Sequence, residues 1–144
     1  MKVFLDTNII MDWCDKNRTG NPFAKTILSS AGPDTYELYV STQSIIDCAY
    51  SLRKLGVDYN EFCGLFRFLR KIAHIVGIDD LDMLWALEHY SGDFEDDMQY
   101  ASAYNAVCDY FITRDKKLKQ LNREHNPMKV ISPEDFVAQM MASS

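Results

Sequence analysis

The sequence predicts an α/β fold built around a central sheet of parallel strands. Short apolar runs alternate along the chain with longer segments of helical periodicity, from KVFL at 2–5 to a helix opened by Ser132-Pro133. Strands that alternate with helices pair in parallel through right-handed crossovers. The chain has 144 residues, of which 47% are hydrophobic, so it is long enough to fill one good core.

The first half of the chain contains two predicted strands and three predicted helices. Proline suits the first turn of a helix, glycine its end, and Ser or Thr its N-cap. These signals predict a strand over 2–5, a helix over 8–16, a helix from Asn21-Pro22 to Gly32-Pro33, a strand over 37–41, and a helix capped by Ser41 or Thr42 that runs to Leu55 before Gly56.

The second half continues the alternation. Asp58 and Glu61 resemble a capping box, and Asp93 is placed to cap a further helix. The expected elements are a helix from Asp58 to Ala73, a short strand over 74–78, helices over 80–90 and 94–108, strands over 110–113 and 129–131, and a C-terminal helix. We expect residues 1–140 to form a single domain, followed by a tail at 141–144.

Composition narrows the class of protein. The net charge of −6 counts against a broad basic face for long duplexes, but it allows an acidic pocket that metal ions neutralise. No apolar run approaches the ~18 residues of a membrane span, and the N-terminus meets Asp6 too early for a secretory signal. We therefore expect a cytoplasmic protein without membrane contact. The four widely spaced cysteines are expected to be reduced thiols rather than zinc ligands or disulfides.

Two aspartates follow predicted strands. Asp6 comes directly after strand 2–5, and Asp115 lies two residues beyond strand 110–113. Ligands of open parallel sheets bind outside the carboxyl ends of the strands, so both acids are candidates for chemistry. Asn8 could orient the Asp6 carboxylate or a bound water. The alternative is that each aspartate caps a helix, which for Asp115 would cover 116–121.

Asp47 is a lone acid in the segment SIIDCAYSL. A carboxylate buried among Ile, Cys and Ala costs several kcal/mol unless something compensates for its charge. Ligation of a metal ion is one such compensation. The alternative is an exposed position on a polar stripe of the same helix with Gln43, Ser51 and Lys54.

Four acids occupy the first turn of the helix predicted at 94–108. Acids at a helix N-terminus are ordinarily stabilising, which is the simple explanation. Four exceed what capping needs, and a cation would relieve their repulsion. Asp93 is the expected cap and an accessory residue, and Asp96, three residues later, is the expected ligand. Asp97 is turned by about 100° from Asp96 and is not included.

Carboxylates without His or Cys companions suit hard cations, Mg²⁺ or Mn²⁺. The three histidines lack metal-pair spacing. A cation held by carboxylates can lower the pKa of a bound water and offset the charge that develops in phosphodiester transfer. The predicted site is therefore a metal site for phosphoryl chemistry.

The same motifs resemble the PIN-domain family. The resemblance rests on LDTN at 5–8, Asp47, DFEDDMQYASA at 93–103 and ITRD at 112–115, and it spans about residues 1–140. It implies a three-layer α/β/α fold around a parallel sheet. It also implies a Mg²⁺- or Mn²⁺-dependent endoribonuclease like the VapC-type toxins of toxin–antitoxin pairs.

The resemblance assigns roles to individual residues. Asp6, Asp96 and Asp115 match the first, third and fourth acids of the family, which are catalytic and metal-binding. Thr113 matches the Ser or Thr that helps to position ligands. Asp47 stands where the family more often has Glu, one methylene longer, so its contact with metal could pass through a water. The number of metal ions stays open.

Basic residues beside Asp115 are candidate phosphate contacts. They are Arg114, Lys116 and Lys117, followed by Lys119 and Arg123. A solvated face is the alternative for this cluster. Single-stranded or looped RNA is the expected substrate, because a metal pocket must reach a splayed backbone. Which RNA is cleaved does not follow from the sequence.

Partners and competing functions follow from the same resemblance. The apolar helix around 62–69 corresponds to a region that in relatives supports dimers or antitoxin docking, so an antitoxin and a homodimer are both expected. One alternative is a catalytically degenerate PIN module that binds RNA or protein. Another is a phosphohydrolase with Asp6 as nucleophile, which Asn8 disfavours because such enzymes usually carry a second acid there.

Overall fold

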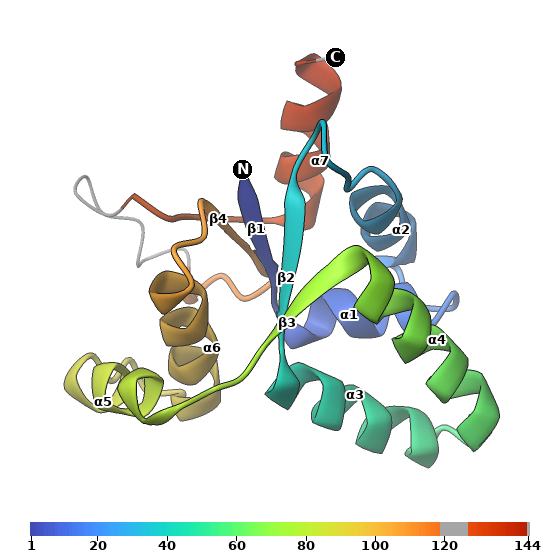
Figure 1. Cartoon of the computed structure of the whole chain (residues 1–144), viewed down its shortest axis with the longest axis horizontal. Coiled ribbons are helices and arrows are strands. Elements are labelled where there is room, and N and C mark those ends of the chain that lie inside the picture. The colour runs from blue at the N-terminus through green and yellow to red at the C-terminus, as the bar shows by residue number, and fades with distance from the viewer. Residues whose placement is uncertain (119–126, 144) are drawn as a thin grey trace.

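The computed structural model describes residues 1–118 and 127–143 of the chain (Figure 1). Within these residues, five strands form one sheet in the order β3-β2-β1-β4-β5, and every neighbouring pair is parallel. The strands are β1 (Lys2–Leu5), β2 (Glu37–Ser41), β3 (Ala73–Val76), β4 (Tyr110–Ile112) and β5 (Lys129–Ile131).

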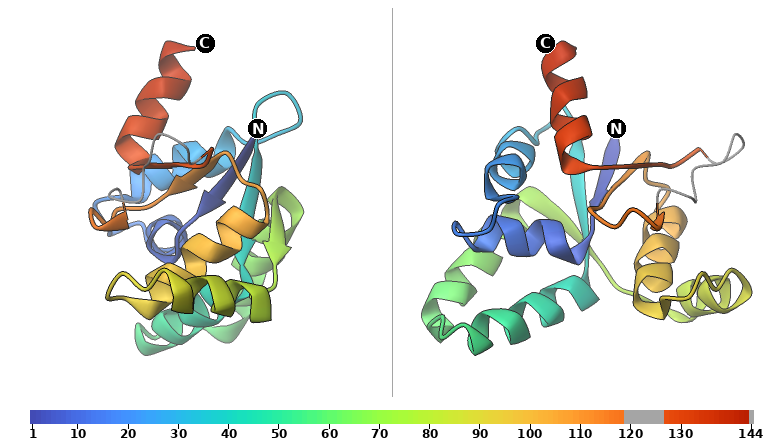
Figure 2. Two further views of the ribbon diagram at one scale, coloured as in Figure 1. Left: turned by 90° about the vertical axis from the view of Figure 1, so that its left-hand side faces the viewer. Right: turned by 180° about the vertical axis from the view of Figure 1, so that it is seen from behind.

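Helices cover both faces of this sheet. α5 and α6 lie on one side, and α1, α2, α3, α4 and α7 lie on the other (Figures 1 and 2). Their bounds are α1 (Thr7–Cys14), α2 (Asn21–Ser29), α3 (Thr42–Lys54), α4 (Tyr59–Ile72), α5 (Asp80–Glu88), α6 (Phe94–Asn105) and α7 (Pro133–Ala142). The predicted three-layer α/β/α fold with a parallel sheet is confirmed.

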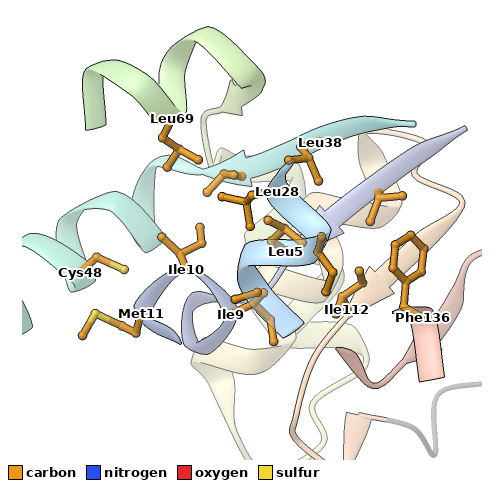
Figure 3. Packing of buried hydrophobic residues seen from close by; sticks show 14 of the residues in the cluster. Leu5, Ile9, Ile10, Met11, Leu28, Leu38, Cys48, Leu69, Ile112 and Phe136 are labelled. Atoms are coloured by element: carbon orange, nitrogen blue, oxygen red, sulfur yellow. The ribbon is translucent and has the colours of Figure 1, made fainter. Parts of the chain in front are cut away.

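Alternation along the central strand separates two cores. Val3 and Leu5 pack into a cluster with α1, α2 and α3 (Figure 3), whereas Phe4 packs on the opposite side with Tyr100 of α6. Successive side chains of a strand point to opposite faces, so one apolar run fills both layers. Phe4 also stacks on Phe111 of β4, with 5.5 Å between ring centroids. β1 is therefore anchored from both sides.

Most helix starts agree with their sequence signals. Asp58, Asp93 and Ser132 each accept a hydrogen bond from a backbone N–H in the first turn, as does Ser41 at the start of α3. Caps of this kind satisfy backbone donors that have no partner within the helix.

Helix ends agree less well with the prediction. α6 stops at Asn105 rather than 108, because Val107 adopts a left-handed conformation with φ 58° and turns the chain toward β4. α1 covers 7–14 instead of 8–16, since Asp15 is extended. α7 continues to Ala142, into the expected tail. Residues 119–121 of the possible helix after Asp115 lie outside the described part.

The order of the strands creates one switch point. From β1 the sheet extends through β2 to β3 on one side, and through β4 to β5 on the other. The carboxyl ends of β1 and β4 are adjacent, and the N–H of Asp6 donates to the carbonyl of Ile112 at 3.0 Å. Crevices at such points are where open α/β sheets bind ligands. The fold therefore brings the residues after β1 and β4 together.

The cysteines and the helix lengths bear on two further expectations. All four cysteines carry free thiols, and burial raises the pKa of Cys14 and of Cys108 to about 12. None of the helices in the described residues has the length and apolar character needed to span a bilayer.

Candidate functional site

An open pocket of about 400 Å³ lies where α1, α3 and α6 begin, at the carboxyl edge of the sheet. Its described lining contains four carboxylates and no Lys, Arg or His. The lining residues are Asp6, Thr7, Asn8, Gln43, Asp47, Ile78, Phe94, Glu95, Asp96, Met98 and Gln99. The predicted residues Asp6, Asn8, Asp47 and Asp96 thus share one pocket, although they are up to 90 positions apart.

Asp6 is the most buried of these acids, with 4% of its surface exposed. One carboxylate oxygen accepts the N–H of Thr7 at 2.8 Å, and the other accepts the hydroxyl of Thr113 at 2.8 Å. Burial raises the pKa of Asp6, the two hydrogen bonds lower it, and the charges of Asp115 and Asp93 raise it further. Asp6 therefore caps α1 and belongs to the acid group at the same time.

Thr113 connects the ends of β1 and β4. Its buried hydroxyl donates to Asp6 and accepts the N–H of Asp115 at 3.0 Å. A hydroxyl has one hydrogen to donate and two lone pairs to accept, so both bonds can form together. Thr113 thus contacts two of the predicted acids.

Asp96 and Asp115 interact directly with each other. Burial raises the pKa of Asp96 to about 8, helped by a hydrogen bond to Asp115 and by the charges of Asp6 and Asp93. That bond to Asp96 is the main cause of the lowered pKa of Asp115. This interaction therefore favours the protonated form of Asp96 and the ionised form of Asp115. Asp93 caps α6 by accepting the N–H of Asp96 at 3.1 Å, as predicted.

The prediction that Asp47 is buried in an apolar helix interior is wrong. Asp47 is half-buried and accepts the side-chain amide of Gln43 at 2.8 Å, one turn earlier in α3. Its neighbour Ile46 points outward with 62% exposure, because the inward residues of α3 are Ser44, Cys48 and Leu52. Asp47 nevertheless lines the pocket, so its placement agrees with a site residue although the argument from burial fails.

A buried polar network centred on Gln99 supports the pocket, and it was not predicted from the sequence. The side chain of Gln99 accepts the hydroxyl of Ser41 at 2.8 Å and donates to Ser44 at 3.0 Å and to Thr7 at 3.2 Å. Gln99 is three residues after Asp96, on the same helix face, a spacing that could have revealed it. The network ties the starts of α1, α3 and α6 together.

Asp97 lies outside the site, as expected. Its carboxylate is fully buried and accepts both the N–H and the hydroxyl of Ser91, at 2.9 and 2.6 Å. It therefore holds the turn that precedes α6. In the described residues, the acids as they stand form no group of three or more with the spacing of a metal centre. Asp6 can keep its bond from Thr113 and still offer lone pairs to a cation, whereas Asp96 is bonded to Asp115, so that bond would have to open for both acids to become ligands.

The basic residues beside Asp115 differ in the contacts that their side chains make. Lys116 and Lys117 are exposed, and the N–H of Lys117 donates to Asp115 at 2.9 Å. Arg114 is exposed as well, but its guanidinium donates to the carboxylate of Asp12 at 3.0 Å. The pocket lining includes none of Arg114, Asp115, Lys116 and Lys117. Lys119 and Arg123 lie outside the described residues.

The raised pKa of Asp96 predicts how stability depends on pH. Between 3.8 and about 8 the folded protein keeps a proton that the unfolded chain has released, so this contribution is complete below 3.8 and is lost as the pH rises through about 8. We expect the melting temperature in EDTA to fall more steeply with pH for the wild type than for Asp96→Asn. Calorimetry across this range tests it; parallel profiles for the two proteins would contradict the assignment.

Comparisons with known proteins give the family. The family profile of the PIN domain matches residues 2–117. Ribonuclease VapC1 of Aquifex aeolicus (strain VF5) is 24% identical over 141 residues, and the alignment covers 94% of this chain and 92% of that protein.

Two solved structures share the fold. The Mycobacterium tuberculosis toxin VapC20, described as cleaving the sarcin-ricin loop, aligns with a TM-score of 0.67 and 13% identity over 83% of this chain and 95% of its own. A toxin–antitoxin complex from Klebsiella pneumoniae aligns with a TM-score of 0.64 and 19% identity over 91% and 97%. With its profile matched over most of its length, the chain belongs to the PIN-domain family.

Proposed function

We propose that this protein is a divalent-metal-dependent endoribonuclease that cleaves single-stranded or looped RNA. The observation that carries the proposal is the pocket at the switch point, which gathers several carboxylates without a described basic side chain. Burying like charges together is costly unless a cation compensates for them. The similarity to a protein named as a ribonuclease supports the same activity.

The donor set fits Mg²⁺ or Mn²⁺. Asp6, Asp96 and Asp115 would hold the ion, because hard cations prefer carboxylate oxygens and their three charges already act on one another. Asp47, on the α3 side of the pocket, would act through a bound water. Asp93 and Asn8 are accessory residues, one capping α6 and the other lining the pocket.

When bound, the metal supplies an activated water and charge stabilisation for phosphodiester cleavage. The protein's own residues prepare for this chemistry. Thr113 fixes the orientation of Asp6 through its hydroxyl, and the network of Gln99 holds the start of α1 beside α6. The carboxyl group of Asp96, whose pKa is raised, would have to be deprotonated to serve as a metal ligand.

Apolar residues of the same pocket suit an unpaired nucleobase. Ile78, Phe94 and Met98 line the pocket, and Phe94 is 39% exposed. An aromatic ring stacks on a base that has left its helix, which favours single strands and loops over duplex. Lys116 and Lys117, exposed beside Asp115, would contact neighbouring phosphates.

An antitoxin partner and a homodimer are part of the proposal. A structural neighbour is described as a toxin–antitoxin complex, which supports the first. α5 and the residues just after it expose large apolar side chains, Leu81, Leu84, Leu87 and Tyr90, each more than half exposed. Exposed apolar patches of this kind mark protein interaction sites. The role proposed for the chain is therefore the toxin of a toxin–antitoxin pair.

Purified protein tests the activity directly. Incubated with a panel of single-stranded, hairpin and duplex RNAs, it should cleave the unpaired substrates with Mg²⁺ or Mn²⁺ and none of them with EDTA. Cleavage that persists in EDTA would refute metal dependence, and preference for duplex would refute the substrate class.

The same experiment separates the alternatives. RNA or protein binding without cleavage would indicate a degenerate PIN module, which the shorter Asp47 would explain. A covalent phosphoryl group on Asp6 would indicate an aspartate-nucleophile phosphohydrolase. The position that such enzymes use for a second acid is Asn8, an exposed amide that lines the pocket.

A further inference from the structure

Asp12 is a second buried acid, one that the proposed mechanism does not use. It lies in α1 and is 1% exposed. One of its carboxylate oxygens accepts hydrogen bonds from Arg18 at 2.8 Å and from Arg114 at 3.0 Å. The other oxygen is buried and has no hydrogen-bond partner among the described residues. Asp12 therefore forms an ion triad beside the acid pocket rather than within it.

The stability of the fold does not by itself explain such a triad. Buried ion pairs gain little over well-packed apolar residues, because desolvation offsets their attraction. Their best-supported use is to specify one geometry among several. The geometry that Asp12 could specify depends on the chain segments that carry its two partners, Arg18 and Arg114.

Arg114 stands between two residues of the proposed site. On one side Thr113 donates to Asp6, and on the other Asp115 donates its N–H to Thr113. β4 ends at Ile112, so the segment 113–117 follows the strand without belonging to a helix or a strand itself. The side chain of Arg114 anchors this segment to α1 through its hydrogen bond to Asp12, which lies 102 positions earlier in the sequence.

We infer that Asp12 and Arg114 are positioning residues, which hold the segment 113–115 so that Asp6 and Asp115 face the same ion. The metal part of this inference rests on the proposed function, whereas the anchoring of the segment does not. It also changes the role expected for Arg114, from a phosphate contact to an internal anchor. Arg18 shares the same carboxylate but sits in the turn between α1 and α2, away from the site.

Arg18 therefore provides the matched control. Arg114→Met and Arg18→Met each remove one arm of the triad and keep the bulk of the side chain. Titration calorimetry with Mn²⁺ alone measures the metal affinity. We expect the affinity to be about tenfold weaker in Arg114→Met, because the residues that support metal ligands affect binding on this scale. In Arg18→Met it should change less than about twofold. Asp12→Asn, which alters the other end of the anchor, should resemble Arg114→Met.

A second readout needs no metal. In EDTA, hydrogen exchange of the Asp115 amide, which is bonded to Thr113, should accelerate in Arg114→Met and stay unchanged in Arg18→Met. Equal behaviour of the two variants in both readouts would overturn the inference. So would an Arg114→Met protein that only binds RNA more weakly, with altered salt dependence, because that identifies a phosphate contact.

The two proposals can fail separately. A wild-type protein that binds no Mn²⁺ refutes the proposed metal chemistry, while the exchange rates still decide whether Arg114 anchors the segment. Should Arg114→Met fold poorly, Arg114→Lys replaces it. Lysine keeps the charge but lacks the planar fork of arginine. We therefore expect a smaller loss of Mn²⁺ affinity and a smaller acceleration of exchange at the Asp115 amide.

Discussion

Replacement of Asp6 by Asn should abolish RNA cleavage and stabilise the metal-free protein at the same time. Asp6 is 4% exposed and burial raises the pKa of its carboxyl group, so its charge is unfavourable without a compensating cation. An amide keeps the shape of the side chain without the charge. Loss of a metal ligand removes several kcal/mol of transition-state stabilisation, which corresponds to a rate lower by about a thousandfold or more.

Two measurements test this prediction together. Cleavage of the preferred single-stranded RNA with Mg²⁺ gives the activity, and thermal unfolding in EDTA near neutral pH gives the stability. The expected result is an inactive protein with a higher melting temperature than the wild type, as found where active sites trade stability for function. An Asp6→Asn protein that cleaves RNA at the wild-type rate would exclude the mechanism.

Asp97 provides the contrasting control. Like Asp6, it is a buried acid whose two oxygens accept hydrogen bonds, here both from Ser91. Unlike Asp6, on which the charges of Asp115 and Asp93 act, it lies outside the pocket that gathers the acids. Asp97→Asn should therefore lower stability by about 1–3 kcal/mol, the cost of disturbing a satisfied buried group. Mn²⁺ binding should persist below its melting temperature. The two substitutions are expected to move stability in opposite directions.

Replacement of Gly20 by Ala should cause the largest loss of stability among the glycine positions. A methyl group there would lie 2.1 Å from a carboxylate oxygen of Asp12 and 2.7 Å from its carboxyl carbon. Gly20 has an ordinary helical backbone conformation, so the cost comes from the contact alone. Asp12 is held by Arg18 and Arg114 and cannot withdraw freely. Overpacking of this kind costs about 1–3 kcal/mol.

Gly64 is the matched control for this substitution. It lies inside α4, and nothing stands within 4 Å of the position that its Cβ would occupy. Alanine favours a helix over glycine by roughly 0.8–1.0 kcal/mol, so Gly64→Ala should raise stability. Chemical denaturation of both variants measures the two effects. A neutral result for Gly20→Ala would mean that Asp12 moves more easily than its two ion pairs indicate.

The element order followed from the sequence because its signals are local. Apolar runs, helix periodicity and caps such as Asp93 and Ser132 act within a few residues, and they placed every strand within two residues of its observed bounds. The failures were also local in origin. The end of α6 depends on the left-handed conformation of Val107, and valine is not a residue type that predicts such a conformation.

The sequence by itself determined the fold class and the set of acids that could meet at the carboxyl edge of the sheet. Only the tertiary structure decided how those acids pair. Thr113 reaches Asp6 across 107 positions, and Arg114 turns to Asp12 instead of the pocket. Asp47 proved half-exposed beside Gln43. Such contacts depend on the packing of distant segments and on side-chain direction, which patterns along the chain do not encode.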